Sequence, residues 1–388
     1  MGEGDVTEGG VAEGAKGLDV TLRQEAPIPL NAHIECPPGE VLALVGPSGG
    51  GKSTILRAIA GLTGITHGHI SCNGSIWYDT QKRIDVATRH RRVGFVFQSY
   101  ALFPHLSALD NVIEALGARP AGARKSRALE LLGLVRLSGL EERRPFELSG
   151  GQQQRVAVAR ALARDPEVLL LDEPFSAVDR ATRQRLHREL SQLRSQLRMP
   201  VVLVTHDLEE AVQLSDRMSI LHHGQTLQDG PPFQVLNHPA NRQVARLIDL
   251  KNIFQARVAG HGAGGEFTRL EWGGNKLEAR YRSDFAAGDL VDWVIPSGSV
   301  ILHRRRGPSR GVRENPVHGV IESMVRLGET VSVSILLDDH DTHPLFMSIS
   351  VHAAARNAIA PGERIGVSLR ADDIHIMPRL PAFHDDDL

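Results

Sequence analysis

The sequence is poor in cysteine and in aromatic residues, and its charges nearly cancel. Only two cysteines, Cys36 and Cys72, occur among 388 residues, and aromatic residues make up 4%. Because neither cysteine has a paired spacing, a disulfide framework and a zinc site are excluded, and we expect a reducing compartment such as the cytoplasm. The formal net charge of −2 lacks the basic excess that binding to a phosphate backbone requires, so we expect no nucleic-acid partner.

Long hydrophobic runs are also missing. The longest, Val41–Val45 and Val168–Leu171, have the length of strands and fall far below the roughly 18 residues that a membrane-spanning helix needs. The start of the chain, Met1–Gly17, mixes glycine with glutamate and has neither the basic start nor the apolar stretch of a secretory signal. We therefore expect a chain that does not cross a bilayer, with residues 1–17 as a disordered leader.

The remaining chain divides into two regions of different pattern. Between residues 18 and 250, short strand-like runs alternate with helical patterns, which predicts an α/β domain with a mainly parallel sheet. At about residues 101–147 leucine-rich helical spacing replaces the strands, so we expect a helical subdomain there. Residues 254–380 show short β-like runs broken by glycine and charged turns, which predicts a small all-β domain. Similar segments at 288–295 and 362–369 favour two repeats, 254–305 and 315–378.

A glycine-rich motif follows the first apolar run and precedes a helical pattern. Its residues are Gly46, Pro47, Ser48, Gly49, Gly50, Gly51, Lys52, Ser53 and Thr54. They match the phosphate-loop pattern in its strand–loop–helix setting. In such a loop backbone N–H groups surround the phosphates, Lys52 supplies a cation and Ser53 offers its hydroxyl to Mg²⁺. The alternative is a plain glycine-rich turn, which has no need of Lys followed by Ser at the start of a helix.

A second apolar strand ends in two carboxylates, Asp172 and Glu173. Alone, such a pair would face solvent. Behind a phosphate loop, it is typical of NTPases in which one carboxylate serves Mg²⁺ and the other polarises the attacking water. We expect Asp172 to serve the metal and Glu173 to act as the general base.

Between these two motifs lies a third, which opens another helical pattern. It consists of Leu148, Ser149, Gly150, Gly151 and Gln152. A glycine-lined helix N-terminus of this kind suits a γ-phosphate. With its neighbours, this segment resembles the signature motif of the ATP-binding-cassette (ABC) ATPases. The resemblance covers roughly residues 18–250 and implies hydrolysis of ATP with Mg²⁺. It also implies a head-to-tail homodimer, in which the signature of one copy completes the phosphate loop of the other.

Three more positions stand in the order of that family. The resemblance implies that Gln98 contacts Mg²⁺ and water, that Asp179 works across the dimer interface, and that His206 touches the γ-phosphate. Glu173, His206 and Gln98 are then the catalytic residues, and Ser53, Gln98 and Asp172 are the Mg²⁺ ligands.

The chain departs from the family pattern ahead of the phosphate loop. Most members carry an aromatic residue there, on which adenine stacks, whereas here no aromatic residue precedes Trp77. Adenine must therefore rest on aliphatic or arginine groups, such as Leu22, Arg23 or Leu30, or lose about 1 kcal/mol of stacking energy. Some molybdate-importer ATPases also lack this aromatic residue.

Residues 91–112 resemble the importer branch of the family, where this surface receives a short helix of the permease. Phe103–Leu106 are the expected contact, and the alternatives are a place in the core or a solvated turn. The resemblance implies integral-membrane permease partners, an indirect link to a substrate-binding protein, and a peripheral position on the cytoplasmic side of the inner membrane. A soluble ABC ATPase outside transport stays open, although such proteins usually carry two cassettes or long coiled-coil inserts.

The C-terminal region resembles the OB-like (TOBE-like) β-barrel of importer ATPases, which in the molybdate group binds oxyanions or otherwise regulates. Ser348, Ser350 and Arg370 fall near the oxyanion-contacting positions of that barrel, and a purely structural barrel is the alternative. Molybdate or tungstate is therefore the first expected solute, followed by sulfate or thiosulfate. Importers of ferric iron, polyamines and sugars share the same architecture.

Overall fold

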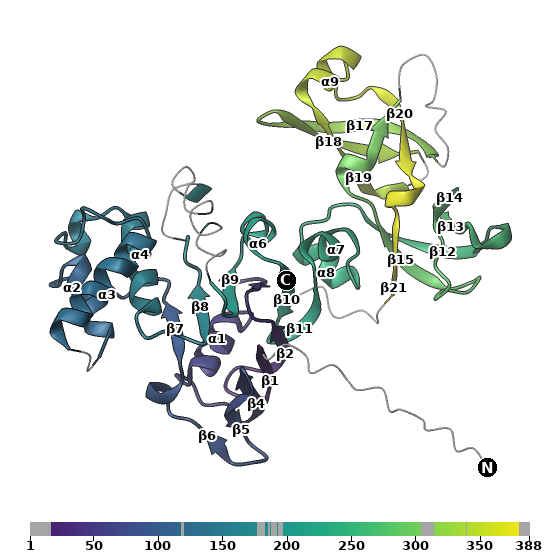
Figure 1. Cartoon of the computed structure of the whole chain (residues 1–388). Helices are drawn as coiled ribbons and strands as arrows, with labels where there is room; N and C mark the ends of the chain where they lie inside the picture. The colour runs from purple at the N-terminus through teal and green to yellow at the C-terminus, as the bar shows by residue number, and fades with distance from the viewer. Residues whose placement is uncertain are drawn as a thin grey trace, which may run out of the picture. The chain divides into compact units, whose positions relative to one another are not determined.

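The computed structural model divides the chain into two compact units, residues 1–232 and 233–388, and Figure 1 labels many of their helices and strands. The structure describes residues 17–117, 120–176, 183–184, 187, 192, 197–303, 314–338 and 340–379. Except for Gly17, the expected leader lies outside these ranges. None of the helices in the described ranges has the length and hydrophobicity needed to span a membrane.

An eleven-stranded sheet organises the first unit, in the order β6-β5-β4-β1-β2-β11-β10-β3-β9-β8-β7. The strands are β1 (Leu18–Gln24), β2 (Leu30–Cys36), β3 (Val41–Val45), β4 (His67–Cys72), β5 (Ser75–Asp79), β6 (Ile84–Asp85), β7 (Val93–Val96), β8 (Val168–Asp172), β9 (Val201–Thr205), β10 (Arg217–His222) and β11 (Gln225–Gly230). The strands β10, β3, β9, β8 and β7 run parallel. The strands β6, β5, β4, β1 and β2 pair antiparallel.

The expectation of a mainly parallel sheet is therefore wrong for the part that contains β1 and β2. Tight turns explain two of the antiparallel pairings, β4 with β5 and β10 with β11, because two strands joined by a two-residue turn must pair antiparallel. Asn73 and Gly74 join β4 to β5, and His223 and Gly224 join β10 to β11. All four residues have positive φ angles, as a type I′ hairpin turn requires.

The parallel strands are buried on both faces, which explains their unbroken apolar runs. In β8, Leu169 and Leu171 belong to one core cluster, whereas Val168 and Leu170 belong to another. This alternation follows from the two-residue period of a strand. The helix α1 (Lys52–Ala60) packs into the second cluster through Ile55 and Ile59 among others.

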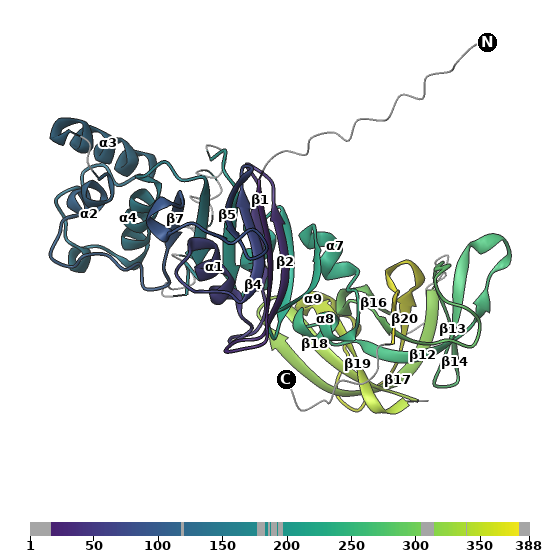
Figure 2. The same ribbon diagram turned by 90° about the horizontal axis from the view of Figure 1, so that it is seen from below.

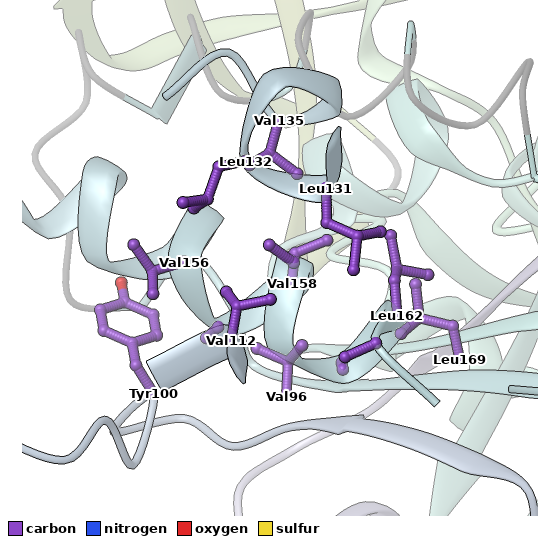
Figure 3. Packing of buried hydrophobic residues seen from close by; sticks show 14 of the residues in the cluster. Val96, Tyr100, Val112, Leu131, Leu132, Val135, Val156, Val158, Leu162 and Leu169 are labelled. Atoms are coloured by element: carbon purple, nitrogen blue, oxygen red, sulfur yellow. The ribbon is translucent and has the colours of Figure 1, made fainter. Parts of the chain in front are cut away.

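The first cluster is the core of the helical subdomain, which was expected at about residues 101–147. It contains α2 (Ala108–Ala115), α3 (Ala121–Leu134), the 3-10 turn η2 (Pro145–Glu147) and α4 (Gly150–Leu162). Figures 1 and 2 show α4 beside β7. Figure 3 shows Val156, Val158 and Leu162 of α4 pointing into the cluster, together with Val96 at the end of β7. The helix α6 (Leu208–Leu214) follows β9.

The second unit holds two five-stranded antiparallel sheets, in the orders β14-β13-β12-β15-β21 and β16-β20-β17-β18-β19. The strands are β12 (Ile253–His261), β13 (Phe267–Trp272), β14 (Asn275–Arg280), β15 (Leu290–Val294), β16 (Val300–Leu302), β17 (Glu314–Leu327), β18 (Thr330–Leu337), β19 (His340–Ser350), β20 (Arg364–Arg370) and β21 (His375–Pro378). The helices α7 (Pro232–Asn237), α8 (Arg242–Leu247) and α9 (Val351–Asn357) accompany them.

The two sheets repeat one pattern with an exchange of strands. If β12–β16 are matched with β17–β21, the orders are the same, except that the last strand of each half joins the other sheet. Thus β16 pairs with β20, and β21 pairs with β15. The similar sequence segments fall on β15 and β20.

The division between the units falls at the start of α7, after Pro232, ahead of the expected boundary at residues 250–254. The reason is packing, because Ala245 of α8 forms a small core with Val294 and Met377. In addition, Arg242 of α8 forms an ion pair with the buried Asp292, at 3.4 Å.

Candidate functional site

The phosphate loop connects β3 to α1. Gly51 is the N-cap of α1 with a φ of 88°, a left-handed backbone conformation that residues other than glycine adopt only at a cost in free energy. Lys52 is buried, and its ammonium group donates to the carbonyls of Gly46 at 2.8 Å and Pro47 at 2.7 Å. Burial lowers the pKa of Lys52, while the negative charges of Glu173 and Asp172 oppose that effect.

The first turn of α1 meets the end of β8. The hydroxyl of Ser53 donates to Asp172 at 2.7 Å, and Asp172 is 5% exposed. Mg²⁺ prefers oxygen ligands and is held in nucleotide sites by one or two protein oxygens together with substrate phosphates. A hydroxyl and a carboxylate facing each other beside a phosphate loop fit that requirement.

Three more predicted residues come together because their strands are neighbours. The strands β7, β8 and β9 are adjacent and parallel, so the residues that follow their carboxyl ends gather at one edge of the sheet. The amide of Gln98 donates to a Glu173 oxygen at 3.2 Å. Nδ1 of His206 lies 3.5 Å from the other oxygen of Glu173. Glu173 itself has a φ of 43°, which turns its side chain out of the regular strand direction.

A cavity of about 440 Å³ opens at this edge, and Gln98, Asp172 and Ser176 line it with Arg57, Phe97 and Ser99. Asp172, which accepts from Ser53, and Gln98, which donates to Glu173, therefore line one space. This arrangement can bind a phosphate chain and activate a water molecule against its end.

The expected signature residues lie at the start of α4. Ser149 accepts from the N–H of Gln152, and the Gln152 side chain accepts from the N–H of Ser149, which forms a capping box. Gly150 and Gly151 begin the helix and Leu148 is buried in the helical cluster. No hydrogen bond or ion pair joins these residues to the phosphate loop within the described ranges. The sequence motif is therefore present, but it does not complete the site of its own chain.

The other end of α4 carries a residue that the sequence analysis missed. Arg160 donates to the carbonyls of Ala101 at 2.7 Å and Tyr100 at 2.8 Å. Both carbonyls belong to residues with positive φ angles, 47° for Ala101 and 61° for Tyr100, and these residues follow Gln98 and Ser99 in the chain. Arg160 also lies 5.8 Å from the ring centre of Phe103. A charged residue among the apolar positions of a predicted helix was the available signal.

Arg160 thus ties the segment after Gln98 to the helix that begins with the signature. The ring of Tyr100 packs in the helical cluster, where Figure 3 shows it close to Val156, and its hydroxyl donates to the carbonyl of Pro174 at 3.4 Å. Phe103, which belongs to the expected permease contact, is 42% exposed, so it is available on the surface.

The structure does not bring the expected oxyanion residues together. Ser350 ends β19 opposite Thr330, next to the end of β17 at Leu327, and Ser348 lies on the same strand. Arg370 ends β20 opposite Glu314, at the start of β17. The two serines and the arginine therefore lie at opposite ends of one long strand. The Ser350 hydroxyl caps α9, and Arg370 lies 3.5 Å from Asp373.

Asp179, which was expected at the interface between two copies, lies outside the residues that the structure describes.

Comparison with known proteins gives a family and several relatives. Residues 30–176 match the family described as ABC transporter. The chain is 39% identical over 323 residues to the spermidine/putrescine import ATP-binding protein PotA of Vibrio parahaemolyticus, which spans 80% of this chain and 83% of that protein. It is 45% identical over 257 residues to the sulfate/thiosulfate import ATP-binding protein CysA of Methylococcus capsulatus. This match covers 65% of this chain and 68% of that protein. A solved dimeric ATP-binding cassette, MJ0796 with ADP and Pi, is 33% identical, covers 55% of this chain and 98% of its own, and has a TM-score of 0.46.

Proposed function

Because this chain belongs to the ATP-binding subunits of ABC importers, which are ATPases coupled to transport, we propose that two copies close head to tail around two Mg²⁺–ATP and so drive a permease. The observation that carries the proposal is the split arrangement of the site. One edge of the sheet gathers Lys52, Ser53, Asp172 and Glu173, while the signature turn at Ser149 forms no hydrogen bond or ion pair with them in the part of the chain that the structure describes. A second copy supplies the missing wall.

Each residue near the phosphate loop has a distinct task in this proposal. Lys52 and the N–H groups at the start of α1 bind the phosphate chain. Ser53, Asp172 and Gln98 hold Mg²⁺, which neutralises charge on the phosphates when bound. Glu173 takes a proton from the attacking water, since its carboxylate is oriented by Gln98 on one side and His206 on the other. His206 then faces the γ-phosphate.

The signature residues act on the nucleotide of the other copy. Leu148 packs in the core of the helical subdomain and fixes the turn. Ser149, Gly150, Gly151 and Gln152 present a capped helix N-terminus whose partial positive charge suits a γ-phosphate. Asp179 is proposed to lie at the interface between the copies.

For the transported solute, we propose sulfate or thiosulfate. Relatives named for these anions reach 45% identity over 257 residues and 44% over 248 residues. Spermidine or putrescine is the second candidate, because PotA matches 80% of this chain, including much of the second unit. Molybdate or tungstate, the first expectation from the sequence, is not named by any of the relatives above, and the separation of Ser350 from Arg370 removes its structural support.

The second unit is proposed to be a TOBE-like regulatory domain, and the complex to be peripheral at the cytoplasmic side of the inner membrane.

Uptake assays test which solute is transported. Vesicles containing the full complex of chain, permease and binding protein are supplied with labelled sulfate or labelled spermidine, with ATP inside. Sulfate uptake that stops in the Lys52→Ala complex supports the proposal. Spermidine uptake alone redirects it to polyamines, and uptake that Lys52→Ala leaves unchanged contradicts a role in transport.

A further inference from the structure

The residues on either side of His206 are linked to one buried carboxylate. Glu210 lies on α6 and is 4% exposed. Its Oε2 accepts from the hydroxyl of Thr205, the last residue of β9, at 2.6 Å. The Thr205 oxygen in turn accepts from the N–H of Asp207 at 3.0 Å. The turn that carries His206 is therefore closed by two consecutive hydrogen bonds that lead to Glu210.

Asp207 fixes the same turn to the start of α6. It is the N-cap of this helix, and its Oδ1 accepts from two N–H groups of the first turn, at 2.8 Å and 3.2 Å. The cap and the hydrogen bond between Thr205 and Glu210 thus hold the backbone before and after His206. The His206 side chain itself stays 57% exposed, with Nδ1 3.5 Å from Glu173.

The other oxygen of Glu210 faces two side chains from the segment that follows Asp179 in the sequence. Its Oε1 lies 3.6 Å from Nε of Arg183 and 3.7 Å from Nε2 of His187. Arg183 also donates to Oδ2 of Asp207 at 3.3 Å. Partners of opposite charge offset the cost of burying a carboxylate, and removing either side of such a pair is strongly destabilising. Glu210 is therefore the centre of a network and not an isolated buried charge.

His187 connects this network to the segment of the general base. Its Nδ1 lies 3.0 Å from Oε1 of Gln213, and its ring meets the ring of Phe175 edge-on, with the ring centres 4.7 Å apart. Phe175 is buried and follows Glu173 by two residues. Burial lowers the pKa of His187, but the neighbouring Glu210 and Gln213 outweigh burial and raise it overall. The cationic imidazole is therefore favoured beside the carboxylate.

We propose that Glu210 is a positioning residue for ATP hydrolysis and that it acts by holding the turn that carries His206. The proposal rests on the role of His206 in the proposed function and deepens it, because it names the group that keeps the imidazole beside Glu173. A misplacement of about 1 Å at a reacting group can lower a rate by about a hundredfold. A hydrogen bond that fixes this turn can therefore act on turnover without contact with the nucleotide.

The first experiment alters the link between Glu210 and the turn. Thr205→Val keeps the shape of the side chain and loses the hydroxyl, whereas Thr205→Ser keeps the hydroxyl. Glu210→Gln keeps an oxygen that can accept from Thr205 but removes the charge. In steady-state ATP hydrolysis by the full chain, we expect Thr205→Val and Glu210→Gln to lower kcat by about tenfold or more. The KM for ATP should not change, because the phosphate loop is intact, and Thr205→Ser should turn over close to the wild-type rate.

The control is Glu209→Gln, which makes the same substitution on the neighbouring exposed carboxylate of α6 and should leave kcat unchanged. Wild-type turnover in Thr205→Val would overturn the proposal. Equal losses in Thr205→Val and Thr205→Ser would overturn it as well, because the hydroxyl would then not be the link. A raised KM with an unchanged kcat would place the network in nucleotide binding, against a positioning role.

The second experiment shows whether the network acts through His206 or only supports the fold. Thr205→Val is combined with His206→Ala, and phosphate release from labelled ATP is followed for wild type, both single variants and the double variant, below the thermal midpoint of all four. We expect the double variant to be no slower than His206→Ala alone, because residues that act as a unit are not additive. A further loss as large as in the wild-type background would overturn the proposal and leave the role of His206 intact. Wild-type turnover in His206→Ala would remove that role itself, and the positioning role with it.

Discussion

Replacing Glu173 by glutamine tests the chemistry at the edge of the sheet. The amide keeps the shape of the side chain and one oxygen that can accept from Gln98, which is 3.2 Å away. It loses the basic oxygen that would take a proton from water, beside Nδ1 of His206. A positioned general base contributes about 10²–10⁴-fold to a rate, which corresponds to roughly 3–5 kcal/mol of barrier. We expect a turnover loss of that size, with ATP binding retained because Lys52 and the phosphate loop are intact.

Two measurements check this result. Phosphate release at saturating ATP gives the turnover, and size-exclusion chromatography with ATP reports whether the variant accumulates as a dimer, as a stalled closed state should. The control is Glu209→Gln, which makes the same substitution on an exposed carboxylate of α6 and should turn over normally. Wild-type turnover in Glu173→Gln would refute the role of Glu173 as the base.

Other substitutions test the supports of the site and of the second unit. Ser53→Ala should weaken Mg²⁺-dependent ATP binding while leaving Mg²⁺-free binding unchanged, because it removes one of two oxygens that are 2.7 Å apart; equal binding curves with Mg²⁺ would contradict this. Arg160→Met should lower the free energy of unfolding by about 2 kcal/mol, because two hydrogen bonds are lost. Adding Ala101→Gly to that variant should recover part of this loss, because glycine tolerates the 47° φ angle at this position. If chemical denaturation shows no recovery, the turn is not strained. Burial lowers the pKa of His375 from 6.5 to about 4, and the nearby His238 and Arg282 act in the same direction. The neutral His375 therefore contributes about 3 kcal/mol to the free energy of unfolding, a contribution that is complete above pH 6.5 and is lost as the pH falls toward 4. His375→Gln should flatten the acid dependence of the second unit's unfolding, and an unchanged dependence would exclude this residue as its cause.

The parts of the site that could be predicted from sequence depend on short segments. The phosphate loop, the Asp172–Glu173 pair and the signature each consist of a few consecutive residues whose setting is visible as a strand or helix pattern. Gln98 and His206 follow apolar strand patterns, so their meeting with Glu173 follows from adjacent parallel strands. These placements follow from short runs of consecutive residues and from the rule that adjacent parallel strands end at the same edge of a sheet.

The parts that could not be predicted depend on contacts between distant residues. A cavity of about 1120 Å³ is lined by residues as distant in the sequence as Arg23, His67 and His223, and nothing in any one of these segments indicates the others. Likewise, the register of β17 with its two neighbours separates Ser350 from Arg370. A sequence repeat reveals equivalent strands but not that β16 and β21 exchange sheets.

A mixing experiment shows whether each ATP site is shared between two copies of the chain. Lys52→Ala removes the phosphate-binding cation, and Ser149→Arg blocks the signature turn, so each homodimer has two defective sites. A mixed dimer combines both defects in one site and leaves the other site intact. We expect mixing of the two inactive variants to restore ATPase activity, up to about half of the wild-type rate per mixed dimer when the sites act independently. Mixed dimers that form, as shown by differently tagged copies, but stay as inactive as either variant alone would contradict a shared site.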